Sequence, residues 1–220
     1  EYDEALQRFK SVIDSGDTKF LEESVARTAE MQYLTQDFPA ALESFKRLQI
    51  IAENPENKQA ARLGIMRCAL QTGQQEEAQL AANELLKDPK LSPEVEAEAR
   101  YIRAKAYIDH KQPAKAVEDL TILSKDTRTV HGAEAKYLLA QYFYDTNDDK
   151  NAEKILEDFA KNGTPHQYWL ARGFILLADI YIRQGDDFQA RQYLTSLQNN
   201  YNGDDDIAGM IENRLGKLKN

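Results

Sequence analysis

Small and apolar residues recur along this chain at helical spacing. One phrase pairs an alanine with a large apolar residue four positions later, as in Ala41 and Phe45 or Ala152 and Leu156. Positions three or four apart share one face of an α-helix, so the phrase predicts amphipathic helices. Its alanine recurs at spacings of 36, 37, 38, 36 and 38 residues, at Ala5, Ala41, Ala78, Ala116, Ala152 and Ala190. This regularity predicts an internal repeat of about 37 residues.

A second helical phrase precedes each alanine from Ala41 onward by about 12 residues. Its clearest copies are Leu139-Ala140-x-x-Phe143 and Leu177-Ala178-x-x-Tyr181, and looser copies are Ala104 to Tyr107, Ile65 to Ala69 and Ala29 to Tyr33. Short polar turns, such as 72–74, 145–150 and 184–187, separate the two phrases. Each repeat is therefore predicted to be a helix, a tight turn, a second helix and a linker, with the alanine allowing two helix axes to approach closely.

Capping signals indicate where several of these helices begin. In three places a capping side chain precedes a proline at the first helical position: Asn54-Pro55, Ser92-Pro93 and Thr164-Pro165. Thr164 and Gln167 also have the spacing of a capping box.

The two phrases and the turn between them resemble the tetratricopeptide repeat. The best copies span Leu177 to Leu197 and Leu139 to Phe159, and the resemblance covers nearly the whole chain. It implies an all-α fold, a right-handed α-solenoid of antiparallel helix pairs with about 12 helices. The period is two to four residues longer than the usual ~34. In this it resembles bacterial cell-envelope members, which implies the periplasm or cell envelope of a bacterium rather than the cytoplasm.

The register predicts one solenoid domain over residues 1–220. It comprises a half repeat at 1–16, full repeats at 17–52, 53–90, 91–127, 128–163 and 164–201, and a capping helix at 202–220. The last helix is amphipathic, with Ile207, Ile211, Leu215 and Leu218 on one face. The chain opens on Glu1 in the middle of a repeat, so we expect it to be a segment of a longer protein.

Composition narrows the function further. The chain has 220 residues with 37 acidic and 28 basic side chains, a net charge of −9 spread over both halves, which argues against a nucleic-acid partner. The longest apolar run, Phe174 to Ala178, is far too short to insert into a membrane. Only 10 glycines and 6 prolines occur, which disfavours an all-β fold because such a fold needs many turns.

Candidate chemistry is sparse. Cys68 lies on an apolar helix face and reads as a small buried hydrophobic residue. The histidines at 110, 131 and 166 lie in different repeats without metal-binding spacing. Asp145-x-Asn147-x-Asp149 begins like a calcium loop but lacks its glycine and its final glutamate. No nucleotide-binding or nucleophile motif is present. We therefore expect no enzyme activity, no metal and no cofactor.

The resemblance implies that the first helices line a concave face that binds peptides or protein segments. Three positions on each of four first helices follow one pattern, apolar, polar, apolar: Leu63, Arg67, Leu70; Tyr101, Lys105, Ile108; Tyr137, Gln141, Tyr144; Ile175, Asp179, Ile182. The apolar positions can equally pack on the neighbouring repeat. The predicted binding residues are Arg67, Leu70, Tyr101, Lys105, Ile108, Tyr137, Gln141, Tyr144 and Asp179.

Two functions follow from this reading. The favoured one is a non-catalytic scaffold, monomeric or weakly dimeric, that binds a protein or peptide on its concave face. The alternative is the recognition arm of a larger enzyme or receptor whose active domain lies outside this segment. A self-associating architectural array is a third possibility.

Overall fold

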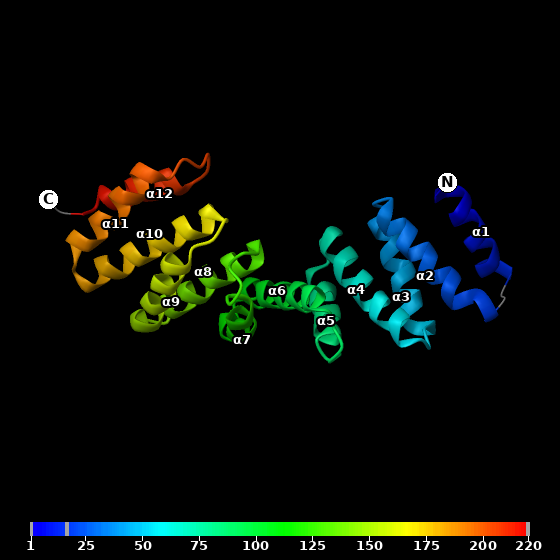
Figure 1. Ribbon diagram of the computed structural model, residues 1–220. Coiled ribbons are helices and arrows are strands. Elements are labelled where there is room, and N and C mark those ends of the chain that lie inside the picture. The colour runs from blue at the N-terminus through cyan, green and yellow to red at the C-terminus, as the bar shows by residue number, and fades with distance from the viewer. Residues whose placement is uncertain (1, 16–17, 219–220) are drawn as a thin grey trace. The chain divides into compact units, whose positions relative to one another are not determined.

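The computed structural model describes residues 2–15 and 18–218, and this part of the chain contains twelve α-helices and no strand, as predicted. It divides into two compact units, Glu1–His110 and Lys111–Asn220 (Figure 1). The first unit holds α1 (Tyr2–Ser15), α2 (Thr18–Leu34), α3 (Phe38–Ile51), α4 (Pro55–Gln71), α5 (Gln75–Leu85) and α6 (Pro93–Asp109). The second holds α7 (Pro113–Leu123), α8 (Val130–Asp145), α9 (Asp149–Asn162), α10 (Gln167–Gln184), α11 (Asp187–Asn200) and α12 (Ile207–Leu215).

Within each unit the helices pack in the order of the sequence. In the first unit α2 packs on both α3 and α4, and in the second α10 packs on α8, α9, α11 and α12. The pairs α2–α3, α4–α5, α8–α9 and α10–α11 each form a helix, a tight turn and a second helix. The boundary between the units falls in the turn between α6 and α7, inside the predicted repeat 91–127. The repeat limits themselves stay a prediction.

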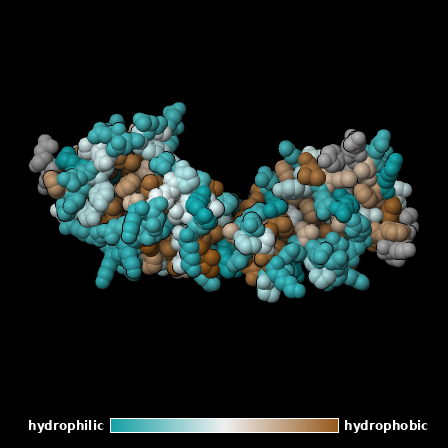
Figure 2. Space-filling view, viewed as in Figure 1, coloured by the Kyte–Doolittle hydropathy of each residue, from teal (hydrophilic) through white to brown (hydrophobic). Residues whose placement is uncertain are grey.

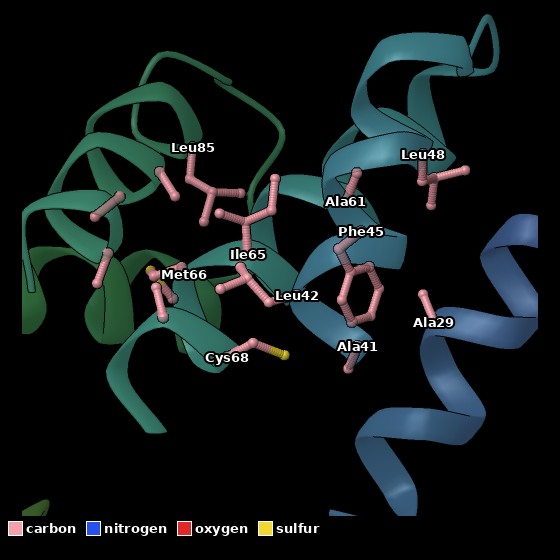
Figure 3. Packing of buried hydrophobic residues seen from close by; sticks show 14 of the residues in the cluster. Ala29, Ala41, Leu42, Phe45, Leu48, Ala61, Ile65, Met66, Cys68 and Leu85 are labelled. Carbon is pink, nitrogen blue, oxygen red and sulfur yellow. The ribbon is translucent and has the colours of Figure 1, made fainter. Parts of the chain in front are cut away.

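The recurring alanines occupy the helix crossings. Five of the six, all but Ala5 of α1, are completely buried. In the first unit the core joins α2, α3, α4 and α5, with Phe45 of α3 near Ala29 of α2 and with Ile65, Met66 and Leu85 close by (Figure 3). Cys68 is part of this core and is fully buried, as its place on an apolar face predicted. A small residue at each crossing thus lets larger neighbours fill the interior.

In the second unit the last helix closes the core, as its amphipathic pattern predicted. Ile207 and Ile211 of α12 are buried against a cluster that includes Ile175 of α10 and Leu194 of α11. The helix begins at Ile207, five residues into the predicted segment 202–220, and Asp205 before it accepts a hydrogen bond from the backbone N–H of Ile207 at 3.1 Å. Hydrophilic side chains cover much of the face of each unit shown in Figure 2, with hydrophobic residues visible between them.

The turn inside each repeat has one backbone conformation. A residue with positive φ, between 58° and 81°, lies five positions before each alanine from Ala41 onward: Gln36, Gly73, Lys111, Asn147 and Gly185. The next residue is the N-cap of the second helix. Where that residue is aspartate, at Asp37, Asp148 and Asp186, its carboxylate accepts a backbone N–H of the following turn. The backbone conformation of the turn therefore recurs with the same period as the buried alanines.

Two of the three predicted helix starts are confirmed, and the third is wrong. Asn54 and Ser92 cap α4 and α6 through their side chains. Thr164 does not cap a helix at Pro165, because its hydroxyl donates to the carbonyl of Thr127 at 2.6 Å and accepts from the N–H of His166. The hydrogen bond to Thr127 holds residue 164 against the loop after α7, and α10 begins three residues later, at Gln167.

Candidate binding surface

The predicted binding residues lie on the first helices α4, α6, α8 and α10, as expected from the register. Arg67 of α4 donates two hydrogen bonds to the carboxylate of Glu98 on α6, from Nε at 2.9 Å and from Nη2 at 2.6 Å. This bidentate contact raises the pKa of Arg67, with the Glu98 hydrogen bond as the main cause. Arg67 therefore joins two successive first helices of the first unit.

Asp179 makes the matching contact in the second unit, with the charges reversed. Its carboxylate accepts from Nε and Nη2 of Arg214 on α12, both at 2.6 Å. Both side chains are about one-fifth to one-quarter exposed. The middle position of the predicted pattern therefore bridges consecutive first helices here as well.

Tyr137, one of the predicted binding residues, is buried. It is only 6% exposed and belongs to the core between α8, α9 and α10. Its hydroxyl donates to Gln141 at 2.9 Å and accepts from Nη2 of Arg172 at 2.9 Å, while its ring lies 5.7 Å from that of Trp169. Packing on the neighbouring repeat, the alternative left open by the pattern, is what the structure shows for Tyr137 and for buried Ile175.

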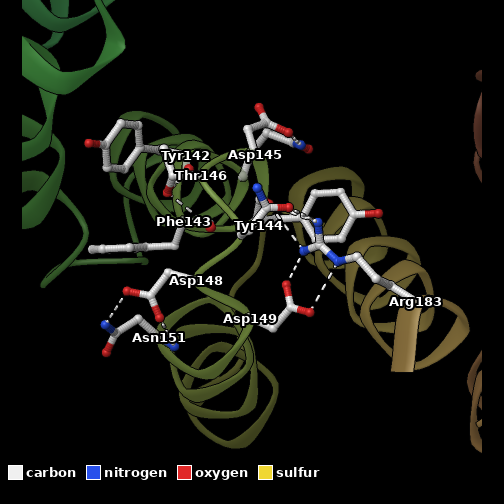
Figure 4. A network of polar contacts seen from close by, with 11 residues as sticks. Tyr142, Phe143, Tyr144, Asp145, Thr146, Asp148, Asp149, Asn151 and Arg183 are labelled. Carbon is white, nitrogen blue, oxygen red and sulfur yellow. Dashed lines mark hydrogen bonds and ion pairs between the residues drawn. The ribbon is translucent and has the colours of Figure 1, made fainter. Parts of the chain in front are cut away.

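Tyr144 is covered by an arginine from the next first helix. The guanidinium carbon of Arg183 on α10 lies 3.7 Å from the centre of the Tyr144 ring, a cation–π contact (Figure 4). Arg183 also donates to the backbone carbonyl of Tyr144 at 3.1 Å and pairs with Asp149. Burial is the main cause that raises the pKa of the Tyr144 hydroxyl.

The other predicted residues belong to the first unit. Tyr101, Lys105 and Ile108 are half-buried on α6, whereas Leu70 of α4 is 40% exposed. The role of the full set in binding stays a prediction.

Sequence reasoning missed the arginines and the glutamate that complete these contacts. Arg67 and Glu98 are 31 residues apart, Tyr137 and Arg172 are 35 apart, Asp179 and Arg214 are 35 apart, and Tyr144 and Arg183 are 39 apart. Each separation is close to one repeat. Complementary side chains about one period apart on consecutive first helices are therefore the signal that could have found them.

The sequence pattern did not predict an apolar groove between α2 and α4, because the predicted binding residues begin at α4 and include none from α2. Its lining comes from α2, α3 and α4: Glu30, Tyr33, Leu34, Phe45, Ala60, Leu63, Gly64 and Arg67. A second, more polar hollow lies between α10 and α12 and includes Asp179, Ile182, Met210 and Arg214. Both units are therefore hollowed between consecutive first helices, α2 and α4 in the first unit and α10 and α12 in the second.

No group of three or more potential metal ligands occurs within residues 2–15 and 18–218. The calcium-like residues have protein partners instead: Asp145 accepts from Gln141, and Asn147 and Asp149 accept from Arg183. Burial raises the pKa of the Cys68 thiol to about 11, which keeps it protonated near neutral pH.

Residues 174–201, which form most of α10 and α11, match a family model described as a tetratricopeptide repeat. The match identifies one tetratricopeptide repeat, over residues 174–201 of the 220. This repeat includes the segment from Leu177 to Leu197, one of the two best copies identified from the sequence pattern. No curated protein sequence matches the chain.

Solved structures similar to this chain include MamA, with a TM-score of 0.58 at 16% identity over 86% of this chain and 95% of that one. BtubC (BKLC) from P. vanneervenii has a TM-score of 0.55 at 15% identity, over 93% and 92%. A tetratricopeptide repeat protein from Parabacteroides merdae ATCC 43184 has a TM-score of 0.42 at 16% identity, over 97% and 98%, an overlay too loose to carry an argument. At such identities the first two likenesses concern the fold alone.

Among the described helices, none combines the length and apolar character needed to cross a membrane.

Proposed function

We propose that this chain is a non-catalytic scaffold that binds a segment of a partner protein on the inner face formed by its first helices. The tetratricopeptide repeat fold is in general a protein-interaction scaffold, which supports the class of function. The cell-envelope location stays a proposal that rests on the repeat length.

The main support for this proposal is that the first helices form grooves whose flanking charged side chains are already held by ion pairs. In the first unit the α2–α4 groove is flanked by Arg67, which is held by Glu98 from the next first helix. In the second unit the Asp179–Arg214 pair holds α10 to α12 beside the second hollow. Side chains that are already ordered lose little conformational entropy when a partner docks, so such a face favours binding.

Site-specific photo-crosslinking in the cells that produce the protein tests this proposal. A photoreactive phenylalanine analogue replaces Leu70 on α4, which is 40% exposed on the inner face, or Leu80 on α5, which is 65% exposed on a second helix. We expect Leu70 to give a discrete cross-linked product with one protein, identified by mass spectrometry, and Leu80 to give none. Equal products at both positions, or products from Leu80 alone, would refute binding on the inner face.

A further inference from the structure

The groove between α2 and α4 has an open apolar floor. Leu63 of α4 packs against the core below, while Leu34, the last residue of α2, is 64% exposed at the rim. Tyr33 lies beside it, and its ring packs edge-on against Phe38 at 5.5 Å. An exposed leucine next to a tyrosine at a concave surface is the kind of site that takes a bulky apolar side chain.

Gly64 contributes to the depth of the groove because it has no side chain. A β-carbon at position 64 would overlap the ring of Phe45, so the ring lies directly against the α4 backbone. Both residues line the groove. The depth is therefore a product of the packing between α3 and α4.

The charges around the groove are predominantly negative. Arg67 is neutralised by the two-point contact with Glu98. On α2, Arg27 is shared between Glu23 at 2.8 Å and Glu30 at 2.9 Å, so this trio carries one surplus negative charge, and Glu30 itself lines the groove. The first unit as a whole, residues 1–110, has 20 acidic and 14 basic side chains. A cationic segment is thus attracted to this rim, whereas an acidic one is repelled.

We infer that the α2–α4 groove takes a partner segment that presents a bulky apolar side chain, such as leucine or phenylalanine, beside a lysine or arginine. The apolar side chain enters between Leu34 and Leu63, and the cation lies near Glu30. This inference rests on the proposed function and specifies the chemistry of the segment that the first unit accepts.

A displayed library of random 12-residue peptides, selected on the immobilised full chain, tests the inference. Enriched peptides are synthesised and their affinities measured by fluorescence anisotropy. We expect them to share an apolar residue next to lysine or arginine and to bind Leu34→Asp at least tenfold more weakly. Leu80→Asp is the matched control, since Leu80 is 65% exposed on α5 and lies outside the groove, and it should retain affinity within twofold.

Charge is tested separately. Glu30→Lys should weaken the same peptides at least threefold, whereas Glu84→Lys, which changes the net charge equally on α5, should not. Circular dichroism checks that each variant is folded. The side chains of Glu30 and Glu84 are both about half exposed, so neither substitution places a charge in the hydrophobic core.

Four results would count against the inference. Peptides that bind Leu34→Asp as well as the parent would place binding elsewhere and leave the scaffold function standing. Peptides enriched in acidic residues beside the anchor would contradict the charge argument. Dimerisation in sedimentation analysis that Leu34→Asp abolishes would assign the groove to a second copy of the chain. Absence of any enriched peptide would count against both the groove and the scaffold function.

Discussion

Three of the five intra-repeat turns place a residue with a side chain in the left-handed region. Gln36, Lys111 and Asn147 have φ of 63°, 58° and 61°, where the equivalent residues elsewhere are Gly73 and Gly185. A side chain with a β-carbon is strained there, whereas glycine adopts the conformation readily. The turn geometry is therefore common to all five repeats, but only two of them have glycine at the position with positive φ.

Replacing Gln36 with glycine is expected to stabilise the chain by about 0.5–1 kcal/mol, because the strain of the left-handed conformation is removed. Urea unfolding followed by circular dichroism measures the change. Gln49→Gly is the control, since Gln49 lies within helix α3, and it should lower stability by about 1 kcal/mol. A loss of stability for Gln36→Gly would contradict the turn conformation.

The N-cap residues that follow these turns also differ, because only some of them make a side-chain capping hydrogen bond. Gln74 and Gln112 make no side-chain capping bond, whereas Asp186 accepts the N–H of Gln189 at 3.0 Å. Gln74→Asp is expected to raise the free energy of unfolding by about 1 kcal/mol, and Asp186→Ala to lower it by a similar amount. Thermal and urea unfolding of the two variants check this pair; changes of the same sign would show that capping is not the cause.

At the scale of helices, two glycines mark close approaches of very different tightness. A β-carbon on Gly64 of α4 would overlap the Phe45 ring, whereas one on Gly173 of α10 would meet Leu156 and Phe159 at 3.4 Å, an ordinary contact distance. The Phe45 ring therefore lies closer to the backbone of α4 than the Leu156 and Phe159 side chains lie to that of α10.

Gly64→Ala is expected to destabilise the chain by about 1–3 kcal/mol, because an overpacked crossing must shift. Gly173→Ala, with room for its methyl group, should be neutral or stabilising by up to about 1 kcal/mol, since alanine favours the helix. Urea unfolding measures both variants. Equal effects would mean that the α3–α4 approach is looser than described.

The linker between α3 and α4 is held by one carboxylate from α2. Glu22 accepts the N–H of Glu53 at 3.0 Å, the N–H of Asn54 at 3.3 Å and the side-chain amide of Asn57 at 2.8 Å. These bonds, the one from Glu53 foremost, lower the pKa of Glu22. The ionised carboxylate thus ties a helix to the start of the next repeat.

Glu22→Gln is expected to cost about 1 kcal/mol at pH 7, because a neutral amide accepts these bonds less strongly. A lowered folded-state pKa gives stability that is present above the unfolded pKa, about 4.3, and is lost as pH falls through the folded value. The difference between parent and variant should therefore shrink below about pH 4. Unfolding curves at pH 7, 5 and 3 test this, and a difference independent of pH would exclude the ionised carboxylate as its source.

At the scale of the molecule, contacts between helices are local in sequence. In both units each helix packs on the one or two helices before and after it. A repeat array of this kind holds its stability in neighbouring interfaces, so a defect in one place need not spread.

Ile211→Ala, which empties a buried site where α12 meets α10 and α11, is expected to cost about 2–4 kcal/mol within the second unit. Hydrogen exchange should speed up in α10, α11 and α12 while α2, α3 and α4 keep their protection. Leu42→Ala, at a buried site of the first unit, should give the reverse pattern. Exchange that rises equally in all helices would show that both units unfold together.

Much of this fold was determined by the sequence alone. The spacing of the alanines and the helical phrases predicted an all-α repeat, the intra-repeat turns at 72–74, 145–150 and 184–187, two of three helix starts and the burial of Cys68. These features depend on residues close together in the chain, where helix periodicity, backbone torsion and capping act directly.

The character of the inner face was decided only by the tertiary structure. The sequence placed Arg67, Tyr137, Tyr144 and Asp179 on first helices but could not show what each one meets. Their partners lie 31 to 39 residues away and come into range only when consecutive helices pack side by side. The α2–α4 groove arises in the same way, since its depth depends on how closely Gly64 approaches Phe45. Local periodicity fixes which face a residue occupies, whereas contacts across a repeat depend on helix approach and side-chain volume.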